Sequence, residues 1–357
     1  MKSNKNRIVA AVVVLAVIAL IWFGRGRIHF DWRVFGEQLR LADWRKMAIA
    51  LACIYAGYVV RSVRWVWLLR HRKKLSPLSL LGTQVIGFTA VALIGRVADL
   101  VRPYLVSKRT GLPISSQIAV YIVERLFDAG SMALITSSVI LLSPSGGLPH
   151  AEIVRKAGYW GLALTLLGTL FLVAVRLWGD TVASVLGGIC GRISKGFGHA
   201  VESKIQAFHS GLDTIRSFSD FGVTAALSLG MWVMIAFAYL ETALAFVASP
   251  ELAAMTPGKA VLLMIVSGGA SVIQLPVLGW FTQIGLVAGA ISKFFGAAPE
   301  AATGCGAALL LLTFLGIVPV GLIWARFEHV SLKKVTEESE HVAEEMAHSA
   351  GASTQEA

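Results

Sequence analysis

Apolar stretches of membrane-spanning length recur along this chain and constrain its fold more than any other feature. They cover residues 47–69, 117–142, 158–178, 221–248 and 301–325. Each has roughly the 20 residues that a helix needs to cross the hydrocarbon core of a bilayer. The pattern predicts an all-α, polytopic membrane protein.

Composition argues against a soluble protein. Hydrophobic residues make up 56% of the 357 residues and charged residues only 15%, against about 25% charged residues in soluble domains. The net charge is +11, but the basic residues lie between apolar stretches, which suits anionic lipid headgroups and not nucleic acid. The three cysteines have no C-x-x-C spacing and are interpreted as packing residues.

Two further apolar blocks, about 78–102 and about 260–295, differ from plain spans. The first runs from an apolar stretch straight into charged residues. The second contains a glycine pair and Pro276, and it ends in a segment, 284–295, that is too short to cross alone. We expect both blocks to form re-entrant or broken helical hairpins beside about six full transmembrane helices.

The two blocks fall in the two halves of the chain, about 47–178 and 221–325, which is consistent with an inverted repeat. An amphipathic segment, 179–220, joins the halves. Lysine and arginine favour cytoplasmic loops, and they are frequent in 70–74 and in 179–220 but absent from 249–258. We therefore predict a protein of the cytoplasmic (inner) membrane with both termini in the cytoplasm.

The ends of the chain flank a predicted transmembrane domain at 47–325. Residues 1–46 are expected to form a retained anchor helix over 8–23 and an interfacial segment, because no clear A-x-A cleavage site follows the apolar run. The loop 24–46 carries six basic residues on the predicted outer side, partly offset by acidic ones. The glutamate-rich tail, 326–357, is predicted to be disordered and cytoplasmic.

Three ionisable residues, Glu124, Arg125 and Asp128, interrupt the stretch 117–142. Helical spacing places them in one patch, since residues three and four apart are neighbours on a helix. At about 2.5 to 3.5 kcal/mol for each centrally placed charge, three unpaired charges would cost roughly 7 to 10 kcal/mol. They must therefore face protein, water or a charged ligand.

Arg96, Asp99 and Arg102 precede this patch and recur every third residue in the break before Pro103. Pro103 lacks an amide hydrogen and disfavours helical geometry at Arg102, which frees backbone groups close to two guanidinium groups. Arginines beside free amides suit a phosphate group. Two roles are open for Arg96, Arg102, Glu124 and Asp128. They form an internal network of ion pairs that only fixes the re-entrant loop, or the same network also contacts a substrate headgroup.

Other polar residues carry less specific signals. Arg61, Arg64 and Trp65 end the stretch that begins at residue 47 and are interpreted as anchors at the cytoplasmic interface. Glu241 is isolated in its stretch, where it either lies near the outer headgroups or couples a proton. The second break carries residues that could cap a broken helix or contact a headgroup: Gln274, Pro276, Gly279 and Gln283.

The motifs of common catalytic sites are absent from the sequence. G-x-x-x-x-G-K-[ST], H-E-x-x-H and G-x-S-x-G do not occur, and the eight histidines are scattered. We expect no catalytic residue, no metal and no cofactor.

Five short segments carry a family pattern: R-x-x-D-x-x-R-P-Y-L from Arg96, K-R-T-G-L-P from Lys108, V-E-R-L-F-D from Val123, R-S-V-R-W from Arg61 and L-P-V-L-G from Leu275. Together they resemble the lysylphosphatidylglycerol synthase transmembrane-region family, also called flippase-like domain proteins, over most of 47–325. The resemblance implies a bundle with two broken or re-entrant elements. It also implies a role in moving or handling lipid headgroups, including aminoacylated phospholipids, across the cytoplasmic membrane.

Three departures limit what this resemblance carries over. The family usually has Pro directly before the first Arg, where this chain has Gly95. It usually has Gly-Glu after that Arg, where this chain has Ala98 and Asp99. Gln283 stands where the family usually has Glu, so a proton-coupling role is not carried over to that position. Because only a short tail follows Arg326, we also expect no soluble aminoacyl-transferring domain and no synthase reaction.

The leading hypothesis is a flippase-like transporter and not an enzyme. It would bind the anionic headgroup of a phospholipid, an aminoacyl-phospholipid or a polyprenyl-phosphate-linked lipid. Its headgroup ligands would be Arg96, Arg102 and Arg125, and its counter-ions Asp99, Glu124 and Asp128. Glu124 and Asp128 are also candidates for proton coupling. Two alternatives are a membrane-embedded transferase acting on a lipid-linked headgroup and a non-catalytic membrane partner of a soluble transferase. Membrane lipids are the expected partners, with a second copy of the chain or a soluble transferase as others.

Overall fold

The computed structural model describes residues 30–143, 151–192, 194–211, 217–270 and 278–338. This part of the chain is helical and contains no strand, which confirms the all-α fold. The predicted anchor over 8–23 lies outside the described residues, as do Gln274 and Pro276.

The described chain begins with a short helix, α2 (Trp32–Arg40), followed by α3 (Trp44–Leu69) and α4 (Pro77–Ile94). Asp43 starts α3, because its carboxylate accepts hydrogen bonds from the backbone amides of the next turn. Proline opens α4 at a position where a missing amide hydrogen breaks no helical hydrogen bond. α3 and α4 pack against each other.

The chain breaks after α4 at Gly95, whose φ of 96° is a conformation that favours glycine. A short 3-10 helix, η1 (Arg96–Leu100), follows, and α5 (Val101–Thr110) packs back against α4. The predicted break is therefore present. However, α4 is a continuous helix of 18 residues and a candidate span by itself, so the block is a broken hairpin whose first arm has spanning length.

Long helices form the middle of the chain: α6 (Ile114–Leu142), α7 (Ala151–Gly191), α8 (Lys195–Gly211) and α9 (Phe218–Leu244). α7 leaves helical geometry at Trp178 (φ −133°, ψ 42°) and then continues, and α8 packs back against it. The end of α7 and α8 thus make up the helical part of the predicted amphipathic segment. A capping box begins α9, in which Ser217 and Asp220 each accept the backbone amide of the other.

The second predicted hairpin consists of two short helices. α10 (Pro250–Ala253) leads to α11 (Pro257–Ala270), which packs against α12 (Leu278–Ala290). α11 has 14 residues, and α12 has 13 and continues into a π-helical turn of five residues. Their lengths are about 21 Å and at most about 27 Å, short of a hydrocarbon core of about 30 Å, and neither is among the candidate spans of the described residues. This agrees with a broken hairpin, and the connection at 271–277 lies outside the described residues.

The C-terminal helices are joined by π-helical turns. One turn, η4 (Ile291–Phe295), ends α12, and another, η5 (Leu311–Leu315), joins α13 (Pro299–Leu310) to α14 (Ile317–Phe327). Residues 332–338 are also helical, and Val335 packs into an apolar cluster with residues of α4 and α5. The prediction of a disordered tail from residue 326 is therefore wrong as far as residue 338.

Five helical segments of the described chain are long and apolar enough to cross a membrane: 44–69, 77–94, 158–191, 218–244 and 299–327. α6 has 29 residues, which corresponds to about 43 Å, and it carries the charged patch. The protein is thus an all-α polytopic membrane protein.

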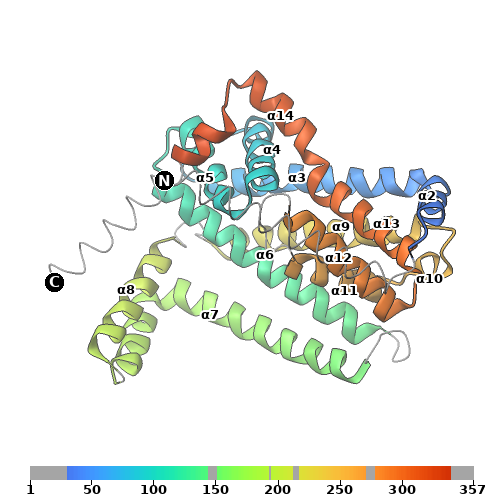
Figure 1. Cartoon of the computed structure of the whole chain (residues 1–357). Helices are drawn as coiled ribbons and strands as arrows, with labels where there is room; N and C mark the ends of the chain where they lie inside the picture. Colours follow the sequence, from blue (N-terminus) through green and yellow to red (C-terminus); the bar gives the residue numbers. More distant parts are fainter. Residues whose placement is uncertain (1–29, 144–150, 193, 212–216, 271–277, 339–357) are drawn as a thin grey trace, which may run out of the picture.

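Helices far apart in sequence surround α6 and α3 (Figure 1). α9 packs along α3, α14 packs on α4, and α7 lies on the outside of α6. The contact between α4 and α14 is close because of Gly321: a Cβ atom there would lie 1.8 Å from the hydroxyl oxygen of Thr89. This arrangement brings α3, α4, α5, α6 and α9 together around the charged patch.

Candidate functional site

The charged patch of α6 is buried inside the helix bundle. Glu124 and Asp128 lie one helical turn apart, and their residues are only 1% and 4% exposed. Ionised carboxylates in such surroundings need positive partners. Four arginines from three helices supply them.

Arg64 of α3 joins the two carboxylates. Its Nη2 lies 2.6 Å from Glu124 Oε1 and its Nη1 lies 2.7 Å from Asp128 Oδ1. Nη1 also donates to the hydroxyl oxygen of Ser228 on α9, at 2.5 Å. Because the Arg64 side chain is 1% exposed, its guanidinium is committed to contacts within the protein.

Arg102 of α5 approaches from the other side of Glu124. Its Nη2 lies 2.6 Å from Glu124 Oε2, and its Nε donates to Gln84 Oε1 of α4 at 2.9 Å. The side chain crosses α4 at Gly87, where a Cβ atom would lie 2.2 Å from Arg102 Cγ. The guanidinium carbon lies 4.4 Å from the ring centre of Phe88, a distance typical of a cation–π contact.

Arg61 and Arg125 complete the network with longer contacts. Arg61 Nη1 lies 3.2 Å and Arg125 Nη2 lies 3.1 Å from Asp128 Oδ2. Their distances to Glu124 Oε1 are 3.6 and 3.9 Å. Their side chains are 11% and 39% exposed, against 1% and 2% for the other two arginines of the network.

The network carries more positive than negative charge. Among the described side chains, four guanidinium groups face two carboxylates, which leaves a net charge of +2. Asp99 lines a cavity that adjoins the network, and including its carboxylate reduces this sum to +1. The site therefore keeps an uncompensated positive charge within a bundle of apolar helices.

This cavity has a volume of about 240 Å³ and lies between the two hairpins. Arg61, Asp99 and Arg125 provide its charged lining residues. Ser267 of α11 and Gln283 of α12 also line it, and the amide nitrogen of Gln283 donates to the Ser267 hydroxyl at 2.7 Å. The remaining lining is mostly apolar and aromatic, with Tyr58, Phe88, Met132, Trp232, Met264 and Phe314 among it.

The cavity lies deep with respect to the basic end of α3. Arg61 precedes Arg70 by nine residues, which is about 14 Å along a helix. Arg70 belongs to the basic turn, which we define as residues 70–74. Arg61 therefore lies in the middle part of α3, away from this basic end.

The predicted site residues divide into several groups. Glu124, Arg125, Asp128 and Arg102 come together, as the spacing suggested, and Asp99 and Gln283 line the adjoining cavity. Gly279 is buried but is not among the lining residues. The backbone of Arg96 belongs to η1, but its side chain lies outside the described part.

The predicted interface anchors need correction. Arg64 and Trp65 are each 1% exposed, and Trp65 Nε1 donates to Gln117 Oε1 of α6 at 3.1 Å. Arg61 lines the cavity. These side chains point into the bundle, where both arginines form ion pairs with the carboxylates of α6. Glu124 is predicted as a site residue because a charge within an apolar stretch needs a partner. The same criterion applies to Arg61 and Arg64 and would have found them.

Glu241 lies apart from the network. Its carboxylate forms an ion pair of 3.3 Å with Lys46 in the first turn of α3. The amide of Asp43 donates to the carbonyl of Ala245 nearby, which places Glu241 close to where α9 ends and α3 begins. Proton coupling at Glu241 stays a prediction. Within the described residues, no group of three or more His, Cys, Asp or Glu side chains could hold a metal.

Comparison with known proteins agrees with the family suggested by the motifs. The family described as Lysylphosphatidylglycerol synthase TM region matches residues 8–321. The glycosyltransferase AglD of Haloferax volcanii is 25% identical over 250 residues, covering 63% of this chain and 39% of that protein. A UPF0104 membrane protein of Methanothermobacter thermautotrophicus is 24% identical over 246 residues, covering 66% of this chain and 69% of that protein. The chain thus spans less than half the length of the glycosyltransferase.

Proposed function

We propose that this chain, which belongs to the lysylphosphatidylglycerol synthase TM region family, binds the anionic headgroup of a membrane lipid in the central cavity and moves it across the membrane. The main support is the cavity-facing pair Arg61 and Arg125, in a network with surplus positive charge. An anionic phosphate bound there would offset that charge. Arginine suits this task because its planar guanidinium can donate two parallel hydrogen bonds to phosphate oxygens.

The four arginines would have two different roles. Arg64 and Arg102 hold the carboxylates and connect α3, α5 and α6, so they would act as structural cross-links. Arg61 and Arg125 would bind the headgroup. Arg61 and Arg125 line the cavity, whereas Arg64 and Arg102 are not among its lining residues.

The hairpins on either side of the cavity suggest how the headgroup would move. α4 and α5 form one hairpin, and α11 and α12, on the other side, are too short to span. Secondary transporters with broken helices expose a site near the bilayer midplane to each side in turn. In our proposal, the α11–α12 hairpin shifts against the arginine network, while the apolar cavity wall accommodates the part of the lipid next to its headgroup.

Reconstitution into liposomes with fluorescent phosphatidylglycerol tests this proposal. Translocation is measured by chemical reduction of the fluorescent probe in the outer leaflet. The masses of the extracted lipids are measured by mass spectrometry. We expect Arg61→Gln and Arg125→Gln to slow translocation by about tenfold each, the effect of losing one charge-assisted hydrogen bond. Arg40→Gln, at the exposed end of α2, is the matched control. Wild-type rates in both cavity variants would contradict the proposed site.

The name of one relative keeps a second function open, that of a membrane-embedded transferase or the membrane partner of a soluble one. The geometry supports it less well. Glu124 and Asp128 are held by arginines, which leaves Asp99 as the cavity-lining carboxylate in the described part that could act as a base. A product of changed mass in the extracted lipids would favour the transferase over the transporter.

A further inference from the structure

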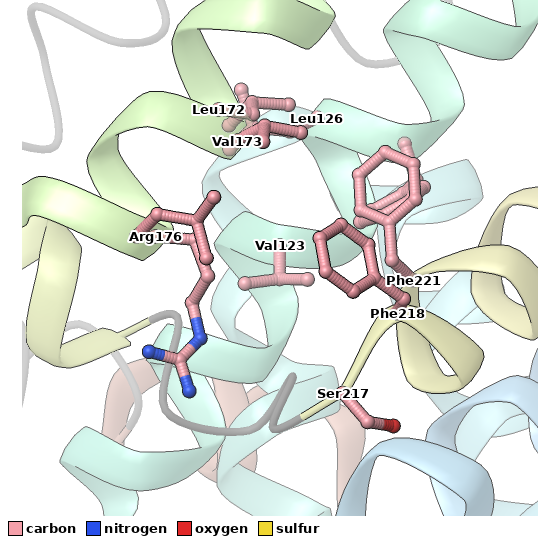
Figure 2. Close-up of a pocket in the computed structure, with 10 residues that line it drawn as sticks. Val123, Leu126, Leu172, Val173, Arg176, Ser217, Phe218 and Phe221 are labelled. Atoms are coloured by element: carbon pink, nitrogen blue, oxygen red, sulfur yellow. The ribbon is translucent and has the colours of Figure 1, made fainter.

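A second pocket, of about 250 Å³, lies between α6, α7 and α9. Figure 2 shows its mostly apolar lining, with Leu126, Leu172 and Val173 toward one end and Phe218 and Phe221 at the side. Val123, Leu126 and Phe127 line it from α6. Helical spacing places these residues on roughly the opposite face of α6 from Glu124, Arg125 and Asp128. The pocket is therefore separate from the central cavity.

The wall formed by α7 faces the bilayer. α7 contains a candidate span of which only 6% is buried within the described structure. Leu164, Leu167 and Leu170 are exposed on it, and Figure 1 shows α7 at the edge of the molecule. In a membrane, surface of this kind contacts lipid chains. Leu177 and Phe218 line the pocket and are also 49% and 75% exposed, so a lipid chain beside α7 can reach it.

One end of the pocket is polar. Figure 2 shows the guanidinium of Arg176 and the hydroxyl of Ser217 on opposite sides of this end of the pocket, away from Leu126, Leu172 and Val173. Ser217 caps α9 beside Asp220, and Asp220 forms an ion pair with Arg70 of the basic turn. The polar end of the pocket thus lies close to a dense group of positive charges, a setting that attracts anionic headgroups.

We propose that this pocket binds one acyl chain of an anionic phospholipid from the surrounding leaflet, with the lipid phosphate at Arg176. The apolar lining matches the chain, and the positive charge at one end matches the headgroup. This site goes beyond the proposed transport function and does not depend on it.

A bound acyl chain would also stabilise the position of α6, because it packs on the face of this helix opposite to the arginine network. Phe127 contacts Phe221 with ring centres 5.1 Å apart, and both rings line the pocket. Val123 and Phe127 directly precede Glu124 and Asp128 in the sequence. A chain packed against them would hold α6 in the position at which its carboxylates meet the arginines.

Photocrosslinking tests the proposal. The full chain is reconstituted with phosphatidylglycerol or phosphatidylcholine that carries a diazirine on one acyl chain, and labelled residues are identified by mass spectrometry. We expect labelling at Leu172, Val173 and Phe221 to exceed labelling at Leu164 of the lipid-facing surface. Phosphatidylglycerol should label the pocket about fivefold more than phosphatidylcholine, the effect of one basic residue near an anionic lipid.

Three variants make the result specific. Arg176→Gln should abolish the preference for phosphatidylglycerol, whereas Arg192→Gln, an exposed arginine beyond the pocket, should keep it. Val173→Trp should fill the pocket and suppress labelling by both lipids, with melting curves used to check that it folds. Even labelling along α7, or unchanged pocket labelling in Val173→Trp, would reduce the site to ordinary annular lipid. Labelling is measured independently of lipid translocation. A chain that does not translocate lipid can therefore still confirm or contradict this binding site.

Discussion

Replacement of Arg64 by glutamine should destabilise the protein far more than the same change at Arg125. Arg64 is 1% exposed and contacts both carboxylates, at 2.6 and 2.7 Å. Removing one partner of a buried ion pair costs about 3 to 5 kcal/mol, because the remaining charge stays buried. At about 2 to 4 °C per kcal/mol, the melting temperature should fall by roughly 6 to 20 °C.

The Arg125 side chain is 39% exposed and its ion pair with Asp128 is longer, at 3.1 Å. Without Arg125, Asp128 still keeps Arg64 at 2.7 Å and Arg61 at 3.2 Å, so we expect the loss of this partly exposed pair to cost at most about 1 kcal/mol. Arg125→Gln should therefore lower the melting temperature by no more than about 4 °C while it slows lipid translocation.

Thermal unfolding in detergent, followed by tryptophan fluorescence, measures both changes. Arg64→Lys provides a graded control, since lysine keeps the charge but lacks the fork that reaches two carboxylates; its melting temperature should lie between those of wild type and Arg64→Gln. A melting temperature of Arg64→Gln within about 4 °C of wild type, or an equal loss of stability in Arg125→Gln, would contradict the different roles of the two arginines.

Three further predictions concern the network, the glycine that Arg102 crosses, and the C-terminal segment 332–338. Arg102→Gln and Glu124→Gln should each cost about 3 to 5 kcal/mol, but the double variant should cost clearly less than their sum, and additive losses in denaturant unfolding would contradict direct coupling. Gly87→Val should displace Arg102 and cost about 1 to 3 kcal/mol by overpacking, whereas Gly130→Val, where a Cβ atom meets nothing within 4 Å, should not destabilise by packing. Hydrogen bonds from the Tyr104 hydroxyl and a neighbouring lysine hold the pKa of Glu338 below its usual range. The contact of 332–338 with α5 should thus persist at neutral pH and weaken as acidification passes through that lowered pKa. Hydrogen exchange of this segment should show the loss, and Glu338→Gln should remove its pH dependence.

The helices could be predicted well because their signal is local. The apolar stretches predicted α3, α6 and α9 to within a few residues at most ends, since lipid requires both length and hydropathy of a spanning helix. The break at Gly95 could also be located, because charged residues interrupt an apolar block there. Packing of 332–338 could not be predicted, because it depends on an apolar contact of Val335 with helices more than 200 residues earlier.

The candidate site was only half predictable for a similar reason. The acids of α6 stand out because no apolar helix carries three charges without partners. Their main partner, Arg64, lies 60 residues away from Glu124, close to a basic loop where arginine commonly anchors a helix at the interface. Sequence spacing therefore favoured Arg102, which is nearer in the chain, and it missed Arg61 as a cavity residue. Only the three-dimensional arrangement separates arginines that hold carboxylates from those that line the cavity.

This separation has a consequence for how the site would select its ligand. Arg64 and Arg102 leave little charge uncompensated around Glu124, so the surplus is concentrated at Arg61 and Arg125, beside the cavity. A ligand without negative charge would enter a site whose positive groups stay unpaired in apolar surroundings, which is unfavourable. An anionic headgroup would instead remove that surplus on binding. The preference for anionic over neutral headgroups would then come from the surplus positive charge of the network. Gln283→Glu adds a carboxylate to the cavity and should weaken this preference.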